Sequence, residues 1–227
     1  MQRWQGVFLD FYGTLACGDR QAVESVCQTV IDDHGLDITA ADLAIKWGDC
    51  YFAAIEAVDG SAFRPLVEIE HDTLIETVLP LAGKVDAGPY IAQLNRYLVR
   101  PPLFQDVPAV LNELTLPICI VSNADERELR AALEYHHLQF EHVVSSEFAR
   151  CYKPKPRIFE VALELTGWST DGVVHVGDSL YSDVGGAHRA GLRAAWVHRA
   201  GRISDIGTEK PDFTWKDLGP IISLQNH

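Results

Sequence analysis

The sequence contains no apolar run that approaches the roughly 20 residues needed to span a membrane, so we expect no transmembrane helix. The N-terminal stretch MQRWQGVFLDFYG runs directly into charged and turn residues, which is unlike a signal peptide. Basic residues are also few, because 19 lysines and arginines stand against 32 aspartates and glutamates and give a net charge of −13. A chain of this charge repels polyanions. We therefore expect no nucleic acid and no membrane among its partners, while a local site could still bind a small anionic molecule.

Cysteine is scarce and shows no pairing pattern. The five cysteines are dispersed, odd in number, and include no CxxC pair: Cys17, Cys27, Cys50, Cys119 and Cys151. This usage favours a reducing cytoplasm over a disulfide framework, and we expect most of these thiols to be small buried side chains. The remaining composition is that of an ordinary globular protein, with 47% hydrophobic and 22% charged residues. The length suits one domain, or a core with an appended subdomain, in a monomer or a homodimer.

Residues 17–100 show helical periodicity and no convincing strand. Four segments in series have this pattern. Gly35 closes the first of them, and Thr39 is the expected N-cap of the second. Short connections between such segments predict a compact antiparallel four-helix bundle.

From residue 101 onward, short apolar segments alternate with helical ones. The segments PICIV, HVVSS, VVHV and LRAAWVH predict parallel strands joined by helical crossovers, with PDFTW as a short edge strand. GVFLDF, near the N-terminus, belongs to the same sheet, because a lone strand ahead of a bundle could not satisfy its backbone. We therefore predict an α/β fold: a Rossmann-like open parallel sheet core formed by residues 1–16 and 101–227, with residues 17–100 inserted as an all-helical cap.

Polar side chains follow several of the predicted strands at the point where each strand ends. Ligands of open parallel sheets bind outside these carboxyl ends. The residues expected there are Asp10 and Thr14 after the first strand, Ser122 and Asn123 after PICIV, and Asp178 and Asp183 after VVHV. Lys153 opens the predicted helix after HVVSS. The sequence thus brings carboxylates, a hydroxyl and one ammonium group to one edge of the sheet.

These segments resemble the four motifs of the haloacid dehalogenase (HAD) superfamily of hydrolases, with a helical cap inserted just after the first strand. FLDFYGTLA resembles the first motif and implies that Asp10 is a nucleophile. IVSN resembles the second motif, with Ser122, and YKPKPRIF the third, with Lys153. VGDSLYSDVGGAHRAG resembles the fourth, with Asp178 and Asp183. The four motifs occur in order across essentially the whole chain, so the resemblance implies a hydrolytic enzyme.

The chemistry of these groups indicates a metal site. A carboxylate nucleophile splits hydrolysis into two steps through a covalent intermediate. Packed beside other carboxylates and an anionic substrate, it needs positive charge nearby, and Mg²⁺ supplies that charge while preferring oxygen ligands. The expected ligands are Asp10, the backbone carbonyl of Tyr12, Asp178 and Asp183.

The other polar groups of this set have expected roles in holding the nucleophile and the substrate. Lys153 would keep Asp10 ionised, and Thr14 would orient the nucleophile or its loop. Ser122 and Asn123, with backbone N–H groups after Asp10, would bind the substrate by hydrogen bonds, and Tyr12 is also expected to contact the substrate.

Tyr12 separates two kinds of HAD enzyme. Phosphatases of the superfamily usually have an aspartate two residues after the nucleophile, which protonates the leaving group; a phenol with a pKa near 10 is a poor substitute. The 2-haloacid dehalogenases read Asp-x-Tyr-Gly-Thr, as here, because halide leaves unprotonated. However, these dehalogenases use no metal and typically carry Ser-Ser-Asn where this chain has Val176-Gly177-Asp178, and the third motif also fits phosphatases.

From the third and fourth motifs we expect a Mg²⁺-dependent hydrolase of a small phosphorylated metabolite. It would act through an aspartyl-phosphate and prefer good leaving groups such as acyl or aryl phosphates. Two alternatives remain open: a metal-independent 2-haloacid dehalogenase, and a non-catalytic binding or regulatory protein with the same fold.

In the cap, Arg64 could face an anionic substrate, although FRPLVEI is equally typical of an ordinary helix N-terminus with Pro65 at its first position.

Overall fold

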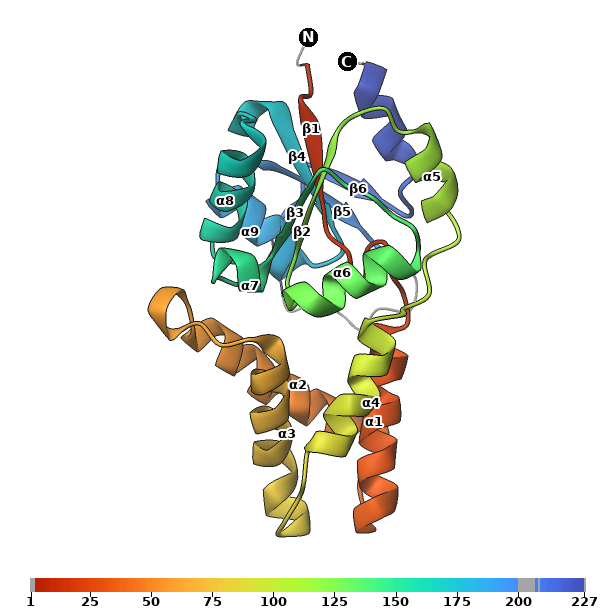
Figure 1. Ribbon diagram of the computed structural model, residues 1–227, viewed down its shortest axis with the longest axis vertical. Coiled ribbons are helices and arrows are strands. Elements are labelled where there is room, and N and C mark those ends of the chain that lie inside the picture. Colours follow the sequence, from red (N-terminus) through yellow and green to blue (C-terminus); the bar gives the residue numbers. More distant parts are fainter. Residues whose placement is uncertain (1–2, 200–206, 208, 227) are drawn as a thin grey trace.

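A six-stranded parallel sheet lies at the centre of the larger part of the computed structural model, which describes residues 3–199, 207 and 209–226 (Figure 1). Its strand order is β3-β2-β1-β4-β5-β6. The strands are β1 (Gly6–Leu9), β2 (Ile118–Ser122), β3 (His142–Ser145), β4 (Val173–Gly177), β5 (Arg193–Val197) and β6 (Phe213–Trp215). The first strand in the chain therefore pairs with β2 on one side and β4 on the other. This confirms that GVFLDF belongs to the sheet and that PDFTW forms an edge strand.

Helices cover both faces of the sheet because the central strands are apolar on both sides. Val7 and Leu9 of β1 pack into one core cluster, whereas Phe8 packs into another on the opposite face. The first cluster includes side chains of α5 (Val107–Glu113), α6 (Glu126–Tyr135) and the 3₁₀ segment η4 (Gly219–Asn226). The second includes α8 (Arg157–Thr166) and α9 (Gly186–Arg189). The remaining short elements are α7 (Ser146–Ala149), η2 (Thr170–Gly172) and the π-helical turn η3 (Leu180–Gly185).

Four longer helices form a separate bundle with its own core. They are α1 (Asp19–His34), α2 (Ala40–Ala57), α3 (Leu66–Ala82) and α4 (Gly88–Leu98), with the short segment η1 (Gly60–Ala62) before α3. As the sequence predicts, α1 ends at Gly35, which has a left-handed φ of 62°. The Thr39 side chain caps α2 by accepting a hydrogen bond from the Asp42 N–H at 3.1 Å. Buried apolar side chains from all four helices fill the space between them.

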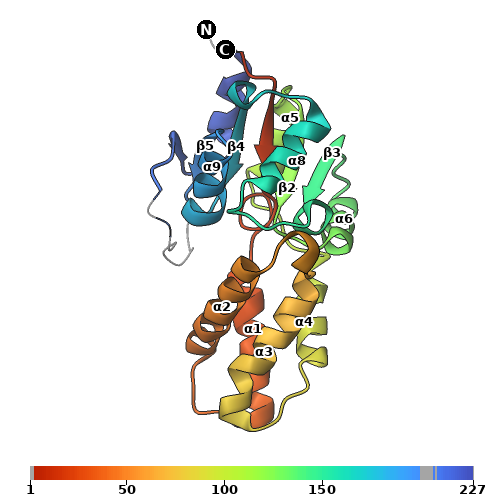
Figure 2. The same ribbon diagram turned by 90° about the vertical axis from the view of Figure 1, so that its left-hand side faces the viewer.

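The bundle lies below the carboxyl ends of the strands, as Figures 1 and 2 show from two directions. The Tyr152 hydroxyl donates a hydrogen bond across this boundary to the Arg64 carbonyl at 2.6 Å, and Lys155 forms an ion pair of 3.1 Å with Asp59. The bundle thus covers the sheet edge where the motif residues were expected. Among the described helices, none is long and apolar enough to cross a membrane.

Lys153 does not open a helix: α7 follows β3 directly, and Lys153 lies in the segment between α7 and α8, which begins at Arg157. The division into residues 1–16 with 101–227 and residues 17–100 stays a prediction. Residues 1–2, 200–206, 208 and 227 of the first part lie outside the described residues.

Candidate active site

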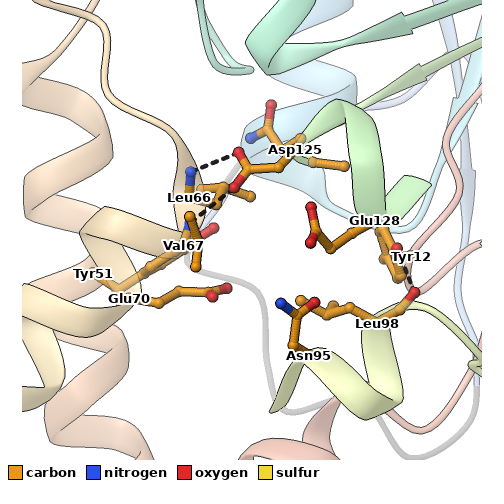
Figure 3. A pocket seen from close by; sticks show the side chains of 11 residues that line it. Tyr12, Tyr51, Leu66, Val67, Glu70, Asn95, Leu98, Asp125 and Glu128 are labelled. Carbon is orange, nitrogen blue, oxygen red and sulfur yellow. Dashed lines mark hydrogen bonds between the residues drawn. The ribbon is translucent and has the colours of Figure 1, made fainter. Parts of the chain in front are cut away.

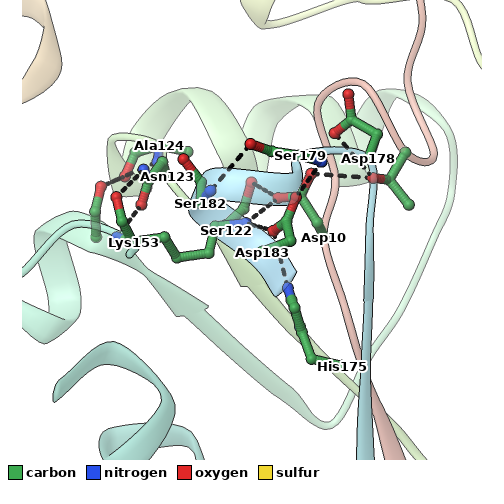
Figure 4. A network of polar contacts seen from close by, with 12 residues as sticks. Asp10, Ser122, Asn123, Ala124, Lys153, His175, Asp178, Ser179, Ser182 and Asp183 are labelled. Carbon is green, nitrogen blue, oxygen red and sulfur yellow. Dashed lines mark hydrogen bonds and ion pairs between the residues drawn. The ribbon is translucent and has the colours of Figure 1, made fainter. Parts of the chain in front are cut away.

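Asp10 follows the last residue of β1 and is held by three side chains from different parts of the chain (Figure 4). Its Oδ1 atom accepts hydrogen bonds from Ser122 Oγ at 2.9 Å and from Lys153 Nζ at 2.7 Å. Its Oδ2 atom accepts one longer bond, 3.2 Å, from Thr14 Oγ1. All four residues are buried. The structure therefore brings together the four residues expected to be catalytic, and it leaves Oδ2 the less engaged oxygen of the carboxylate.

Lys153 is a buried ammonium group between two carboxylates. Its Nζ contacts Asp10 Oδ1 at 2.7 Å and Asp183 Oδ1 at 2.6 Å. Burial alone would lower the pKa of Lys153, but the two carboxylates raise it above its usual value. Asn123 fixes the backbone of Lys153 through both of its amide atoms, at 2.7 Å to the N–H and 3.1 Å to the carbonyl. The Asn123 side chain, expected to bind substrate, is thus engaged in holding the lysine.

Asp183 is the most strongly held carboxylate of the site. Besides Lys153, it accepts hydrogen bonds from His175 Nε2 at 2.8 Å and from the Ser179 N–H at 2.9 Å. Burial works toward a higher pKa, but Lys153 and His175 hold the pKa of Asp183 well below its usual range. His175 was not among the expected site residues. Its position as the one polar side chain within the buried strand VVHVG was the sequence signal for it.

The carboxylates of Asp10, Asp178 and Asp183 form a buried cluster in which one oxygen of each lies within 4.8 Å of the others. Two glycines make this approach feasible. A Cβ on Gly13, whose φ is +85°, would lie 2.5 Å from an Asp178 oxygen, and a Cβ on Gly177 would lie 2.1 Å from the Asp183 carboxyl carbon. Three carboxylates against one ammonium leave an excess of negative charge. The cluster therefore has the oxygen chemistry and the charge that a divalent cation requires.

Tyr12 and Arg64 lie differently from the groups around Asp10. The Tyr12 hydroxyl donates a hydrogen bond to the Leu98 carbonyl at 2.8 Å, at the end of α4. Burial, together with the nearby carboxylates, raises the pKa of this phenol far above its usual value. Arg64 is 41% exposed and forms ion pairs with Asp72 at 2.6 Å and Glu68 at 3.3 Å. The structure does not bring Arg64 to the other expected site residues.

A cavity of about 150 Å³ lies beside these residues, between the bundle and the sheet (Figure 3). Tyr12 and Asn123 line it from the sheet side, and Tyr51 and Glu70 line it from the bundle. Glu70 was not among the expected site residues. The signal for Glu70 was a carboxylate one helical turn after Leu66, on the face that α3 buries.

The α/β core, its inserted bundle and the carboxylate at the end of β1 define a class of hydrolase. Residues 4–191 match the family model of haloacid dehalogenase-like hydrolases. The chain belongs to this family, as its motifs indicate.

Full-length relatives carry dehalogenase activities in their names. Haloacetate dehalogenase H-2 of Moraxella sp. (strain B) is 26% identical and covers 99% of both chains. The (S)-2-haloacid dehalogenase of Pseudomonas sp. (strain YL) is 24% identical over 97% of this chain and 94% of its own. Among solved structures, the L-2-haloacid dehalogenase RSc1362 has a TM-score of 0.79 at 20% identity, covering 99% of this chain and 100% of its own. At that identity the structural likeness shows the fold, including the helical cap.

The expectation of a phosphate hydrolase acting through an aspartyl-phosphate is wrong. Relatives named as phosphatases align with only part of the chain: glyceraldehyde 3-phosphate phosphatase of Pyrococcus furiosus is 35% identical over 33% of it. The dehalogenases, by contrast, span nearly all of it. The physical reason lies at position 12, where a phenol bound to Leu98 replaces the acid that would protonate an alkoxide. The third and fourth motifs of this chain therefore do not identify a phosphatase.

Proposed function

We propose that the protein is a hydrolytic dehalogenase of small 2-haloacids, in which Asp10 displaces the halide and is regenerated by water. The observation that carries this proposal is a buried carboxylate nucleophile, held by Ser122, Thr14 and Lys153, with a tyrosine in place of a general acid. Halide is a stable anion and leaves without a proton. The full-length likeness to haloacetate and 2-haloacid dehalogenases supports the same reaction.

In the first step Asp10 Oδ2 attacks the carbon that bears the halogen. A C–O bond forms, the C–halogen bond breaks, and the halide leaves with the bonding electron pair. Oδ2 is assigned as the attacking atom because Oδ1 already accepts two hydrogen bonds, one of them from an ammonium group. Burial raises the pKa of Asp10 above its usual value, and the charge of Lys153 opposes that rise and favours the ionised carboxylate. The product of this step is an ester between Asp10 and the substrate.

In the second step water attacks the Asp10 carboxyl carbon and releases the 2-hydroxy acid. Ser122 Oγ and Lys153 Nζ, which contact Oδ1 in the resting site, lie where negative charge develops on that oxygen. One proton of this water passes to the alkoxide oxygen of the departing 2-hydroxy acid, and the other is released to solvent, so that Asp10 is regenerated as a carboxylate. Halide, hydroxy acid and one proton are the net products of one haloacid and one water.

The carboxylates around Asp10 would also be able to hold a divalent cation. Asp10, Asp178 and Asp183, with the Tyr12 carbonyl, are the groups that would hold Mg²⁺, and the close approach of three carboxylate oxygens fits a hard cation. A magnesium-bound HAD hydrolase of Bacillus subtilis has a similar fold, with a TM-score of 0.77 at 19% identity. The ion would neutralise the excess negative charge. It would also draw electron density from Asp10, so we propose that halide release does not require it.

The bundle completes the site in this proposal. Residues 17–100 act as a cap that closes over the core of residues 1–16 and 101–227 and excludes water from the first step. A cytoplasmic location and a monomer or homodimer stay predictions.

The test is halide release from 2-chloropropionate, with and without a chelator, by the purified protein and by the Asp10→Asn variant. We expect release from the unaltered protein in both conditions and none from the variant. Mass spectrometry after rapid quenching should detect the substrate acid attached to Asp10. Absence of both halide and the ester across a panel of 2-haloacids would refute the proposal, and ligand binding without turnover would instead favour a non-catalytic role.

A further inference from the structure

The cavity between bundle and sheet is acidic, which is unexpected beside a site for an anionic substrate. Three carboxylate residues, Glu70, Asp125 and Glu128, line it, together with Tyr12, Tyr51 and other neutral side chains. Among the described residues that line it there is no lysine, arginine or histidine. Figure 3 shows Glu70 reaching in from α3 and Glu128 from α6, on opposite sides of the space.

Asp125 has a structural role that leaves the other two carboxylates unmatched. Its oxygens accept hydrogen bonds from the Leu66 N–H at 2.6 Å and the Val67 N–H at 2.9 Å, the first two residues of α3. This contact joins the core to the start of a cap helix and matches a carboxylate to the positive end of that helix. Glu70 lies one turn further along the same helix, so the contact also sets its position in the cavity.

Glu70 is a buried carboxylate without a partner. It is 9% exposed, and no hydrogen bond or ion pair joins its side-chain oxygens to any described residue, although its backbone carbonyl accepts a hydrogen bond from Thr73. Glu128 is 7% exposed, and among the described residues its ion pair is a loose contact of 3.8 Å with Arg127, whose side chain is 84% exposed. The Oδ1 atom of Asn95, also on the cavity wall, is buried and accepts no hydrogen bond. A buried acceptor without a hydrogen bond is costly, and a donor on a ligand in the cavity would satisfy these oxygens.

We infer that this cavity binds a protonated amine carried by the substrate, so that the preferred substrate is a 2-haloacid with an ammonium group at its far end. This inference rests on the proposed function. An ammonium group offers three N–H donors, which Glu70, Glu128 and Asn95 Oδ1 can accept from three sides. The rings of Tyr12 and Tyr51 provide apolar wall for the methylene groups beside it. The positive charge also offsets the excess of carboxylates around Asp10, which a simple haloacid would increase.

A metal ion fits this cavity less well than an organic cation. Among the described residues, the carboxylate group close enough to hold an ion is the cluster around Asp10, and Glu70, Asp125 and Glu128 are not part of it. A cavity of about 150 Å³ has room for an amine with a few methylene groups. Tyr12 and Asn123 line it, and they stand two residues after the nucleophile and directly after Ser122 in the sequence. The inference places the amine end of the substrate in the cavity and its haloacid end at Asp10.

Turnover and binding test this inference separately. Halide release is compared for 6-amino-2-chlorohexanoate and 5-amino-2-chloropentanoate against 2-chlorohexanoate and 2-chloropentanoate. We expect kcat/KM to be at least ten-fold higher for the amines. Glu70→Gln should reduce this ratio by about ten-fold, whereas Glu76→Gln, on an exposed position of α3, should leave it unchanged. Equal kcat/KM for amine and parent acid would overturn the inference while leaving the proposed function intact.

Calorimetry with 6-aminohexanoate and hexanoate provides a readout without chemistry. Binding of the amine that weakens in Glu70→Gln supports the inference even if no halide is released, in which case the proposed function alone fails. Tighter binding of hexanoate than of the amine would overturn the inference. Such a result would mean that a protonated Glu70 donates to a carboxylate, with the neighbouring Asp125, Glu128 and Tyr51 tuning its charge.

Discussion

Replacing Glu70 with glutamine should stabilise the protein, and the gain should grow with pH. Burial, with the nearby Asp125 and Glu128 carboxylates, raises the pKa of Glu70 from 4.5 to about 8. Between these two values the folded chain holds a proton that the unfolded chain has released. Folding stability therefore falls as pH rises from 4.5 toward 8, and is unaffected by this group beyond that range.

The magnitude follows from the size of the pKa difference. One pKa unit corresponds to about 1.4 kcal/mol, so a rise from 4.5 to about 8 corresponds to an upper limit of about 5 kcal/mol. Between pH 5 and pH 8 the wild-type chain should lose up to about 4 kcal/mol through this group. Water in the cavity reduces this value. We therefore expect the difference in unfolding free energy between Glu70→Gln and the wild-type protein to change by about 2 to 4 kcal/mol between pH 5 and pH 8.

Urea denaturation at pH 5, 6.5 and 8 measures this difference. Glu70→Gln should be close to wild type in stability at pH 5 and clearly more stable at pH 8. Glu76→Gln, from the exposed face of the same helix, is the matched control and should show no pH-dependent difference. If the Glu70 difference is constant across this range, the carboxyl group is hydrated or paired in solution. The reasoning about the cavity would then be wrong.

Three further predictions concern the groups around Asp10. Lys153→Met removes the ammonium group between two buried carboxylates, so it should destabilise the fold by about 3 to 5 kcal/mol and abolish halide release. Urea denaturation at neutral pH measures the loss of stability, and a change below about 1 kcal/mol would contradict the ion-pair geometry. Asp178→Asn removes one of three candidate metal ligands but neither the nucleophile nor Lys153. It should therefore lose Mg²⁺ affinity in calorimetry while halide release stays within about ten-fold of wild type. Loss of turnover would show that the carboxylate itself is needed. Tyr12→Phe should leave turnover largely intact and lower the free energy of unfolding by about 1 kcal/mol, because it removes the hydrogen bond to Leu98. A hundred-fold or greater loss of turnover would reassign Tyr12 as a catalytic residue.

The sequence determined the fold and the residues at the nucleophile. Apolar segments such as VVHVG specify buried strands, and strands separated by helices specify a parallel sheet, so the polar residues at strand ends had to meet at one edge. Asp10, Ser122, Lys153, Asp178 and Asp183 could be expected together for that reason. Tyr12 in the first motif agrees with the dehalogenase names of the full-length relatives, whereas the third and fourth motifs favoured a phosphatase.

The tertiary structure alone decided what surrounds that edge. Glu70 and Glu128 lie 58 positions apart in the printed sequence, on helices of the bundle and the core. Nothing in either local pattern says that they face one another across a cavity. Arg64 has the charge for an anion anchor, but the turn before α3 points it toward Glu68 and Asp72. Whether a side chain meets solvent or a buried partner depends on how the bundle and the core pack against each other, and local sequence does not encode that packing.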